Sequence, residues 1–272
     1  MCDALPVIGP RDLSPALEAF NTKWAAPYGR VAKTLHRLVG AAARLSGSRV
    51  LRARALGPFG FQPGNNATRV FEYPWAALAV PVEAGEIVVD IGGSLGGLQF
   101  VLAKEGASVI NVDPSDAAAM GWPLDQETFA DMNRAFGTTV ELRKRFLADA
   151  GIESESVDKV YCISTIEHIP QAEIASLMKE IRRILRIGGH AILTVDLFYD
   201  LTPFTDRSAN VHGTNIDIAA LIGASGMTLV QGDRAQLNGY PEFDPRVVLS
   251  QAQDHVQGHL AVNTAQAFVL RK

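Results

Sequence analysis

A glycine-rich segment after an apolar run is the part of the sequence whose residue types point most directly to chemistry. Residues 90–97 read DIGGSLGG, and the run EIVVD leading into them predicts a buried strand. Gly92 follows that strand, where a backbone without a Cβ can turn sharply and approach a ligand. Gly96 and Gly97 begin a predicted helix, whose free amides and dipole favour a polar or anionic ligand. The segment predicts either a nucleotide-binding turn or a tight turn without a ligand.

A carboxylate at the end of the next predicted strand favours the nucleotide interpretation. Asp113 follows SVINV, where an acidic side chain can accept hydrogen bonds from both hydroxyls of a ribose. The same combination of glycines and a later acid binds the ribose in dinucleotide sites. Alone, Asp113 would equally suit a capping or solvated aspartate. Together with the glycines it predicts a nucleoside site.

The spacing of the glycines argues against a dinucleotide. The dinucleotide pattern is G-x-G-x-x-G, but Ser94 stands where the second glycine would be. Asp90 lies just before the turn, where a carboxylate repels a pyrophosphate. It suits an ammonium-bearing ligand, or hydrogen bonds that fix the loop. An NAD-dependent oxidoreductase is therefore a weak alternative.

The order of the predicted elements places these residues at one edge of a sheet. Apolar runs alternate with amphipathic stretches from residue 86 onward, which predicts an α/β fold with a doubly wound, mostly parallel seven-stranded sheet. Ligands of such sheets bind beyond the carboxyl ends of the strands. The expected strands are 86–91, 108–113, 144–149, 157–164, 190–198, 227–233 and 264–272, and the expected helices between them are 95–106, 124–136, 171–185 and 216–226.

The first 80 residues differ from the rest of the chain. Apolar side chains recur at helical spacing, and the first helix is expected to start at Asp12 or Ser14, with Pro15 in its first turn. Tyr28 and Arg30 precede a second helical stretch and could close over a ligand, or simply start that helix. We therefore expect a helical cap and linker over residues 1–80 and a nucleoside-binding domain over residues 81–272.

Composition and charge limit the class of protein. The chain has 272 residues, of which 47% are hydrophobic and 20% charged, as is usual for a globular enzyme. Its net charge of −4 gives no cationic surplus for a nucleic-acid backbone. Its two cysteines lie in no CxxC or Cys/His cluster, so we expect neither disulfides nor a metal site. Without a signal-peptide pattern or a membrane-spanning apolar run, we expect a cytoplasmic protein with no membrane partner.

The motifs, taken in order, resemble those of the class I S-adenosylmethionine-dependent methyltransferases. The first motif of that family is acid-x-Gly-x-Gly-x-Gly, which DIGGSLG matches except at Ser94. Asp113 matches the acid after the second strand of the family. FLADA, ESVDKVYCISTIEHI and MKEIRRILRIGGHAILTV resemble the adenine-reading segment, the fourth strand and the helix-turn-strand that follows, although Ile187 replaces a frequent proline. The resemblance covers residues 70–200 and implies that S-adenosyl-L-methionine is the cofactor.

The resemblance also implies a set of cofactor-binding residues at the carboxyl ends of the expected strands. Those along the methionine and ribose are Asp90, Gly92, Gly93, Ser94 and Asp113; those around the adenine are Pro114, Ser115, Asp149 and Ala150; those after the fourth strand are Ile163 and Ser164. A surface-loop role is the alternative for Asp149.

Two side chains are candidates for catalysis. His168, in STIEHIP, follows the fourth expected strand, and an imidazole titrates near neutral pH, so it is the candidate base. Its alternative is a structural histidine that orients the loop. Asp196 ends the fifth expected strand and could bind an amine or hydroxyl of the acceptor, or cap a loop. Alignment with an activated methyl group can also suffice without a base.

Two further segments are candidates for contacts around the site. FEYPWAAL, residues 71–78, resembles a segment before the first strand of some small-molecule methyltransferases; an aromatic latch for the cap is its alternative. His212 lies in a polar insert that is a candidate wall of the substrate site or a surface loop.

Two classes of function follow from the resemblance. The first is methyl transfer to oxygen or nitrogen of a small molecule, such as a secondary metabolite or a sugar. No Asn/Asp-Pro-Pro-Tyr/Phe tetrapeptide, which marks methylation of planar amino groups in the family, follows the fourth strand. The second is a methyltransferase fold that binds the cofactor but catalyses a cyclisation or isomerisation. The oligomeric state is left open, with a homodimer as one option.

Overall fold

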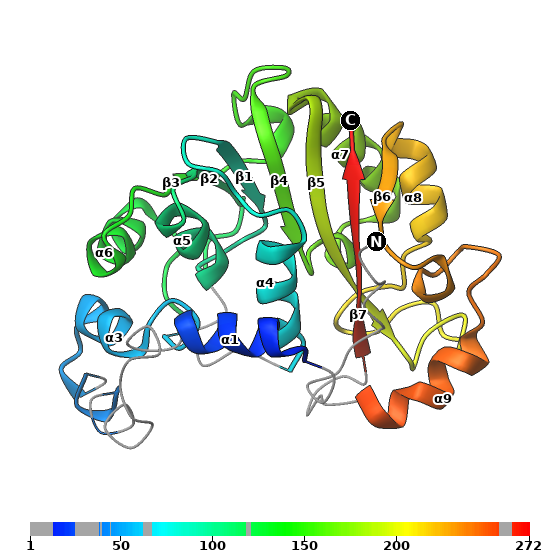
Figure 1. The fold of residues 1–272 in the computed structure, drawn as a ribbon, viewed down its shortest axis with the longest axis horizontal. Coiled ribbons are helices and arrows are strands. Elements are labelled where there is room, and N and C mark those ends of the chain that lie inside the picture. Colours follow the sequence, from blue (N-terminus) through cyan, green and yellow to red (C-terminus); the bar gives the residue numbers. More distant parts are fainter. Residues whose placement is uncertain are drawn as a thin grey trace. The chain divides into compact units, whose positions relative to one another are not determined.

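The fold is an α/β arrangement with one mixed sheet. The computed structural model describes residues 13–24, 38, 40–43, 45–61, 67–117, 121–255 and 263–272. Its seven strands follow the order β3-β2-β1-β4-β5-β7-β6 (Figure 1). All pairings described between neighbouring strands are parallel except those of the last strand, β7. The predicted fold class, a mostly parallel seven-stranded sheet with helices, is confirmed.

The described residues divide into two compact units. The amino-terminal unit comprises Ser14–Asn65 and Pro81–Ala150, and the carboxy-terminal unit comprises Asn66–Val80 and Gly151–Lys272. The boundary expected near residue 80 between a cap and a domain stays a prediction. Tyr28 and Arg30 lie outside the described residues.

The amino-terminal unit carries the first three strands. Ser14 lies just before its first helix and its hydroxyl accepts a hydrogen bond from the Leu17 amide at 3.4 Å, as expected for a helix start. Strand β1 pairs in parallel with β2, and β2 with β3. Its elements are α1 (Pro15–Trp24), α3 (Arg49–Leu56), β1 (Ile87–Ile91), α5 (Gly97–Lys104), β2 (Ser108–Val112), α6 (Gln126–Phe136), β3 (Glu141–Arg143) and a 3-10 turn (Leu147–Asp149).

The strand predicted at residues 144–149 is wrong. The third strand lies earlier, at Glu141–Arg143, and residues 147–149 form a 3-10 turn. Lys144, Arg145 and Phe146 are all exposed, so this stretch has no buried face with which to join the sheet.

The carboxy-terminal unit carries the other four strands. Strand β4 is buried along its whole length and pairs in parallel with β5, whereas β7 runs antiparallel to β5 and β6. Its elements are α4 (Ala67–Ala79), β4 (Val157–Ile163), a 3-10 turn (Ile166–His168), α7 (Gln171–Ile184), β5 (Leu185–Phe198), α8 (Ile218–Ser225), β6 (Thr228–Gln231), a second 3-10 turn (Arg234–Gln236), α9 (Pro245–His255) and β7 (Asn263–Arg271).

Helix α4 packs against β4, β5 and β7 within this unit (Figure 1). It contains the aromatic segment 71–78, with Pro74 inside the helix. Phe71 and Trp75 are buried, and so is the acidic Glu72 between them. The helix therefore brings a charged side chain into the interior of the unit.

Two features that would change the functional interpretation were absent from the described ranges. None of the helices there has both the length and the apolar character needed to cross a membrane. Nor are three His, Cys, Asp or Glu side chains grouped there so as to hold a metal ion.

Candidate active site

The turn after β1 adopts a backbone conformation that glycine favours. Gly92 has φ of +67° and its amide donates a hydrogen bond to the Val112 carbonyl at 2.9 Å. Ser94 also lies in the left-handed region, with φ of +47°. A residue with a Cβ is strained there. Ser94 thus adopts a backbone conformation that a glycine would adopt without strain.

Asp113 clamps this turn from the end of β2. Its carboxylate accepts one hydrogen bond from the Ser94 amide, at 3.0 Å to Oδ2, and one from the Ser115 amide, at 2.9 Å to Oδ1. Each oxygen of a carboxylate has a second acceptor position. The carboxylate can therefore still accept hydrogen bonds from two hydroxyls, which fits the ribose of the cofactor implied by the resemblance.

Two buried amide side chains, Gln99 and Asn111, bind the backbone of the turn after β1. The Ser94 carbonyl accepts hydrogen bonds from Gln99 Nε2 at 2.9 Å and from Asn111 Nδ2 at 3.2 Å. The two amide side chains are themselves joined at 2.9 Å, and both are fully buried. The turn is thus fixed before any ligand arrives. Sequence reasoning missed these residues, although each is a polar residue inside an otherwise apolar helix or strand.

Asp90 lies against the backbone of the same turn. It is buried, and a Cβ placed on Gly93 would be only 2.2 Å from Asp90 Oδ2. Only glycine therefore fits at position 93. Both interpretations of Asp90, a partner for an ammonium-bearing ligand and a carboxylate that fixes the loop, stay predictions.

The residues expected around the adenine also lie in the amino-terminal unit. Pro114 and Ser115 are exposed after β2, and Asp149 is exposed on the 3-10 turn. Ala150 is buried, and its carbonyl accepts a hydrogen bond from Arg143 at 2.9 Å. An adenine-binding role stays a prediction for each of these four residues.

A second cluster of polar groups lies in the carboxy-terminal unit and is centred on Glu72. Ser164 and Thr194 each donate a hydroxyl hydrogen bond to Glu72 Oε1 at 2.5 Å. Arg69 forms an ion pair with the other oxygen, Oε2. The Glu72 side chain has no exposed surface. The sequence did not indicate Arg69 and Glu72 as site residues, because their partners Ser164 and Thr194 lie far away along the chain.

Asp196 is the member of this cluster that remains partly exposed. Its Oδ1 lies 3.3 Å from Ser164 Oγ. Burial and then the negative charge of Glu72 raise the pKa of Asp196 to about 7, against the opposing effects of Arg69, Ser164 and Asn263. Asp196 is therefore poised to exchange a proton near neutral pH.

Glu167 adds a third acid to the cluster. Its Oε1 accepts a hydrogen bond from the Asp196 amide at 3.3 Å, and its Oε2 has no partner among the described residues. Burial raises the pKa of Glu167 well above its ordinary value, followed by the charges of Asp196 and Glu72, whereas Arg69 lowers it. Ile163, expected to line the cofactor site, is buried at the end of β4.

His168 lies at the end of the turn that also carries Glu167. It is exposed. Partial burial lowers its pKa, a hydrogen bond with the His212 backbone opposes this, and the charges of Arg69 and His212 lower it further. The imidazole is therefore neutral at pH 7 and can accept a proton.

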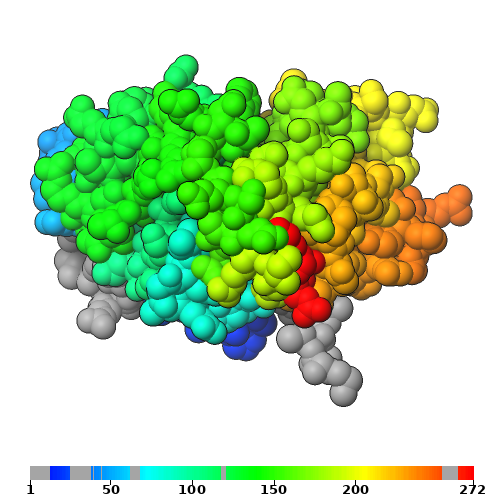
Figure 2. All heavy atoms as spheres, turned by 90° about the horizontal axis from the view of Figure 1, so that it is seen from above, coloured from blue at the N-terminus to red at the C-terminus, as the bar shows by residue number. Residues whose placement is uncertain are grey.

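A pocket of about 410 Å³ opens beside His168. One wall is the turn with Glu167, and the other belongs to the connection between β5 and α8. Atoms of that connection, yellow in Figure 2, form part of the exposed surface. The pocket lining is Glu167, His168, Ile169, Pro170, Gln171, Ser208, Ala209, Asn210, Gly213, Thr214 and Asn215.

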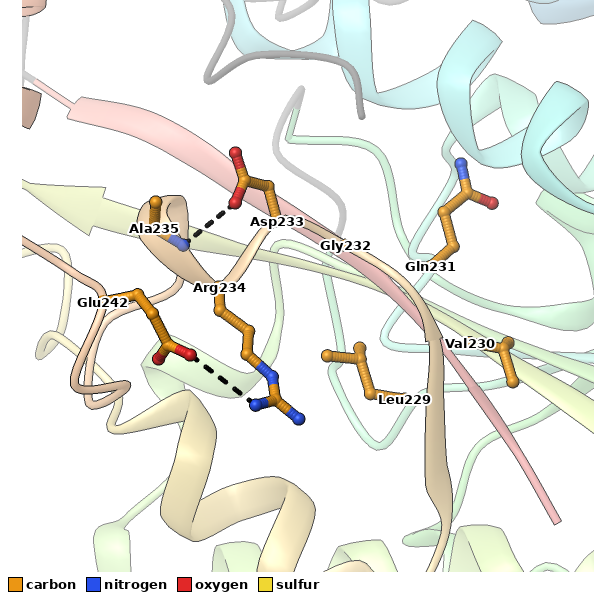
Figure 3. Close-up of a pocket in the computed structure, with 8 residues that line it drawn as sticks. All are labelled: Leu229, Val230, Gln231, Gly232, Asp233, Arg234, Ala235 and Glu242. Atoms are coloured by element: carbon orange, nitrogen blue, oxygen red, sulfur yellow. Dashed lines mark hydrogen bonds and ion pairs between the residues drawn. The ribbon is translucent and has the colours of Figure 1, made fainter. Parts of the chain in front are cut away.

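A second pocket, of about 520 Å³, lies along the outer strand β6 (Figure 3). Arg234 spans it toward Glu242 at 3.6 Å, and Asp233 caps the following turn through the Ala235 amide at 3.0 Å. It is lined by residues 229–235 and Glu242. Its lining contains neither the Glu72 cluster nor His168.

Comparison with known proteins identifies the same family as the motifs do. Residues 89–193 match the family described as "Methyltransferase domain". The chain is 29% identical, over 116 residues, to a ubiquinone biosynthesis O-methyltransferase of Hahella chejuensis; the match covers 42% of this chain and 42% of that relative. The chain thus spans less than half the length of that curated relative.

Solved structures share the fold at low sequence identity. A 1,6-didemethyltoxoflavin-N1-methyltransferase of Burkholderia thailandensis superposes with a TM-score of 0.53 and 16% identity, covering 89% of this chain and 91% of that one. A geranyl diphosphate methyltransferase in complex with S-adenosylmethionine gives a TM-score of 0.51 and 14% identity, covering 77% and 92%. The domain matched over residues 89–193 and the shared fold agree with the resemblance of the ordered motifs to the class I S-adenosylmethionine-dependent methyltransferases, and one of these solved structures holds S-adenosylmethionine.

Proposed function

We propose that the protein transfers the methyl group of S-adenosyl-L-methionine to an oxygen or nitrogen atom of a small molecule. The observation that carries the proposal is the geometry of Asp113, which clamps the turn after β1 through Ser94 and keeps acceptor positions for a ribose. The printed names of a relative and a solved neighbour, an O-methyltransferase and an N1-methyltransferase, support both classes of acceptor atom.

The cofactor-binding roles are divided along the chain. In the amino-terminal unit, Asp90, Gly92, Gly93 and Ser94 would hold the methionine and ribose end, and Asp113 the ribose hydroxyls. Pro114, Asp149 and Ala150 would hold the adenine. Ile163 and Ser164, in the carboxy-terminal unit, stay predicted cofactor residues on the resemblance alone. The cofactor supplies an activated methyl group on a sulfonium, so the protein needs to supply only alignment and a path for a proton.

Asp196 is the proposed proton acceptor for the methyl acceptor molecule. A hydroxyl or ammonium group becomes nucleophilic as it loses a proton, and Asp196 is the one carboxyl group of the Glu72 cluster that solvent reaches. His168 is the second candidate, because its imidazole is neutral at pH 7 and lines a pocket. The polar lining of that pocket suits a small polar acceptor.

The remaining expectations concern location and partners. We propose a cytoplasmic enzyme whose partner is a small molecule, with no nucleic-acid substrate, since the chain carries a net charge of −4. A homodimer stays an open prediction.

A non-methylating reaction is the second candidate, and one observation favours it. Asp196 and Glu167 both have raised pKa values, so the cluster can donate protons, as a cyclisation or isomerisation requires. Product analysis separates the two functions: a rearranged product with unconsumed cofactor would support this candidate.

Calorimetric titration tests the cofactor part of the proposal. S-adenosylmethionine and its demethylated product are expected to bind, and NAD is expected not to bind. Binding of NAD without binding of S-adenosylmethionine would overturn the proposal.

A further inference from the structure

We infer that Glu72 is a positioning residue that acts on Asp196 through Ser164, so that helix α4 supplies a working part of the proton-accepting site. The inference rests on the proposed function only in taking Asp196 as the proton acceptor. It assigns a role to a residue outside the matched methyltransferase domain, which begins at residue 89.

Of the two acids Glu72 and Asp196, the hydrogen-bond donors around Glu72 favour Glu72 as the ionised one. Oε1 accepts two hydroxyl hydrogen bonds at 2.5 Å, from Ser164 and Thr194, and Oε2 is paired with Arg69. Short hydrogen bonds of this kind and an arginine partner are typical of an ionised carboxylate. Glu72 therefore carries a negative charge in the interior of the unit, where Arg69, Ser164 and Thr194 stabilise it.

Ser164 links this charge to Asp196. A serine hydroxyl has one hydrogen, and here it lies on the line to Glu72, the nearer acceptor at 2.5 Å. The same hydroxyl can also donate to Asp196 Oδ1, at 3.3 Å, a hydrogen bond that lowers the pKa of Asp196; Glu72 Oε1, as the nearer acceptor, competes for that hydrogen. Ser164 has φ of +43°, so its hydroxyl is held in a strained backbone conformation between the two acids.

The surroundings of Asp196 make it the group that changes protonation. Glu72 and Arg69 face it from α4, Glu167 from the turn after β4, and Asn263 from β7. Burial and the charge of Glu72 raise its pKa to about 7. Asp196 is also partly exposed, whereas Glu72 is not. The ionised form of Asp196 can thus receive a proton from a ligand and release it to solvent.

The transfer step balances with this assignment. The lone pair of the acceptor oxygen or nitrogen forms a bond to the methyl carbon, the carbon–sulfur bond breaks, and its electrons stay on sulfur. The proton of the acceptor passes to the Asp196 carboxylate. A later exchange with water restores the ionised form.

Glu72→Gln tests the inference, because it keeps the shape of the side chain and removes its charge. The titration midpoint of Asp196, followed by NMR of protein with ¹³C-labelled aspartate and assigned with Asp196→Asn, is expected to fall by about one pH unit. The acid limb of the rate profile for methyl transfer should move by the same amount. Glu242→Gln, an exposed acid of the same unit, is the matched control and should move neither.

A second variant keeps the inference testable if Glu72→Gln does not fold. Ser164→Ala removes a hydrogen bond that lowers the Asp196 pKa, so its midpoint should rise. Opposite shifts in the two variants are not expected from a general loss of stability. An Asp196 midpoint that moves in neither variant would overturn the inference. The NMR titration needs no activity, so failure of methyl transfer in the wild type would overturn the proposed function without affecting this result.

Discussion

Ser164 Oγ donates a hydrogen bond to Glu72 Oε1 at 2.5 Å, although the two residues lie 92 positions apart in the chain. Helix α4, which carries Glu72, precedes the first strand, and Ser164 follows β4 directly. The contact brings a buried acid to the carboxyl end of β4, where ligands of parallel sheets bind. The proton-accepting role proposed for Asp196 therefore depends on a helix that precedes the matched domain, which begins at residue 89.

Asp113→Ala is expected to weaken S-adenosylmethionine binding at least tenfold. The substitution removes the acceptor for the ribose hydroxyls and releases the amides of Ser94 and Ser115. Asp116→Ala is the control, since Asp116 is 97% exposed and its carboxylate pairs with Lys144. Calorimetry should give an unchanged affinity for the control. Equal affinities for wild type and Asp113→Ala would contradict the ribose assignment.

Gly93→Ala is expected to destabilise the protein by about 2 kcal/mol and to weaken cofactor binding. Its Cβ would lie 2.2 Å from Asp90 Oδ2 and 2.6 Å from Asn111 Nδ2. Gly223→Ala is the control, because Gly223 lies in α8 with no atom within 4 Å of a new Cβ. A helical alanine there should raise stability by up to about 1 kcal/mol. Urea unfolding measures both, and equal effects would show that the turn tolerates a side chain.

Asp196→Asn is expected to change how stability depends on pH. The pKa of Asp196 is raised from its ordinary value of 3.8 to about 7 in the folded chain. Between these values the unfolded chain has lost a proton that the folded chain keeps, so wild-type stability falls as pH rises. The variant lacks this loss. Its stability relative to wild type should increase by about 2 kcal/mol from pH 4 to pH 8, a magnitude that allows for the partial exposure of Asp196.

Urea unfolding of both proteins at the two pH values measures this difference. Groups common to the two proteins cancel in the comparison. A stability difference that is the same at pH 4 and pH 8 would show that Asp196 does not titrate in this range.

His168→Ala is expected to reduce the rate of methyl transfer less than Asp196→Asn does. A positioned base contributes about 10²- to 10⁴-fold, and Asp196 is the acid joined to the buried network. We therefore expect a loss of at least about 100-fold for Asp196→Asn and less than about tenfold for His168→Ala. Rates from pH 5 to pH 9 measure both variants. A larger loss in His168→Ala would identify the histidine as the base.

The cofactor turn could be predicted from the sequence because its parts are close along the chain. Glycines after a strand and an acid after the next strand are local features, and the structure places Asp113 directly on Ser94. The supporting amides of Gln99 and Asn111 left a signal, since polar residues inside buried elements need partners. The sequence alone does not say that these two residues are each other's partners, because only the fold brings α5 and β2 together.

The acid cluster could not be predicted in the same way. Aromatic residues flank Glu72 in the sequence, so the segment predicts an apolar helix face. Helical periodicity alone does not show which of its side chains contacts β4. The partner of Glu72 is set by tertiary packing of α4 on β4, β5 and β7. Asp196 could be placed at a strand end from its sequence, but its raised pKa depends on this packing.

Transfer of a labelled methyl group tests the central claim most directly. The protein is incubated with methyl-labelled S-adenosylmethionine and a fractionated extract of small metabolites. The account predicts a labelled small-molecule product with wild type and at least about 100-fold less with Asp196→Asn. A product that forms without label, while the cofactor is recovered unchanged, would contradict methyl transfer as the reaction.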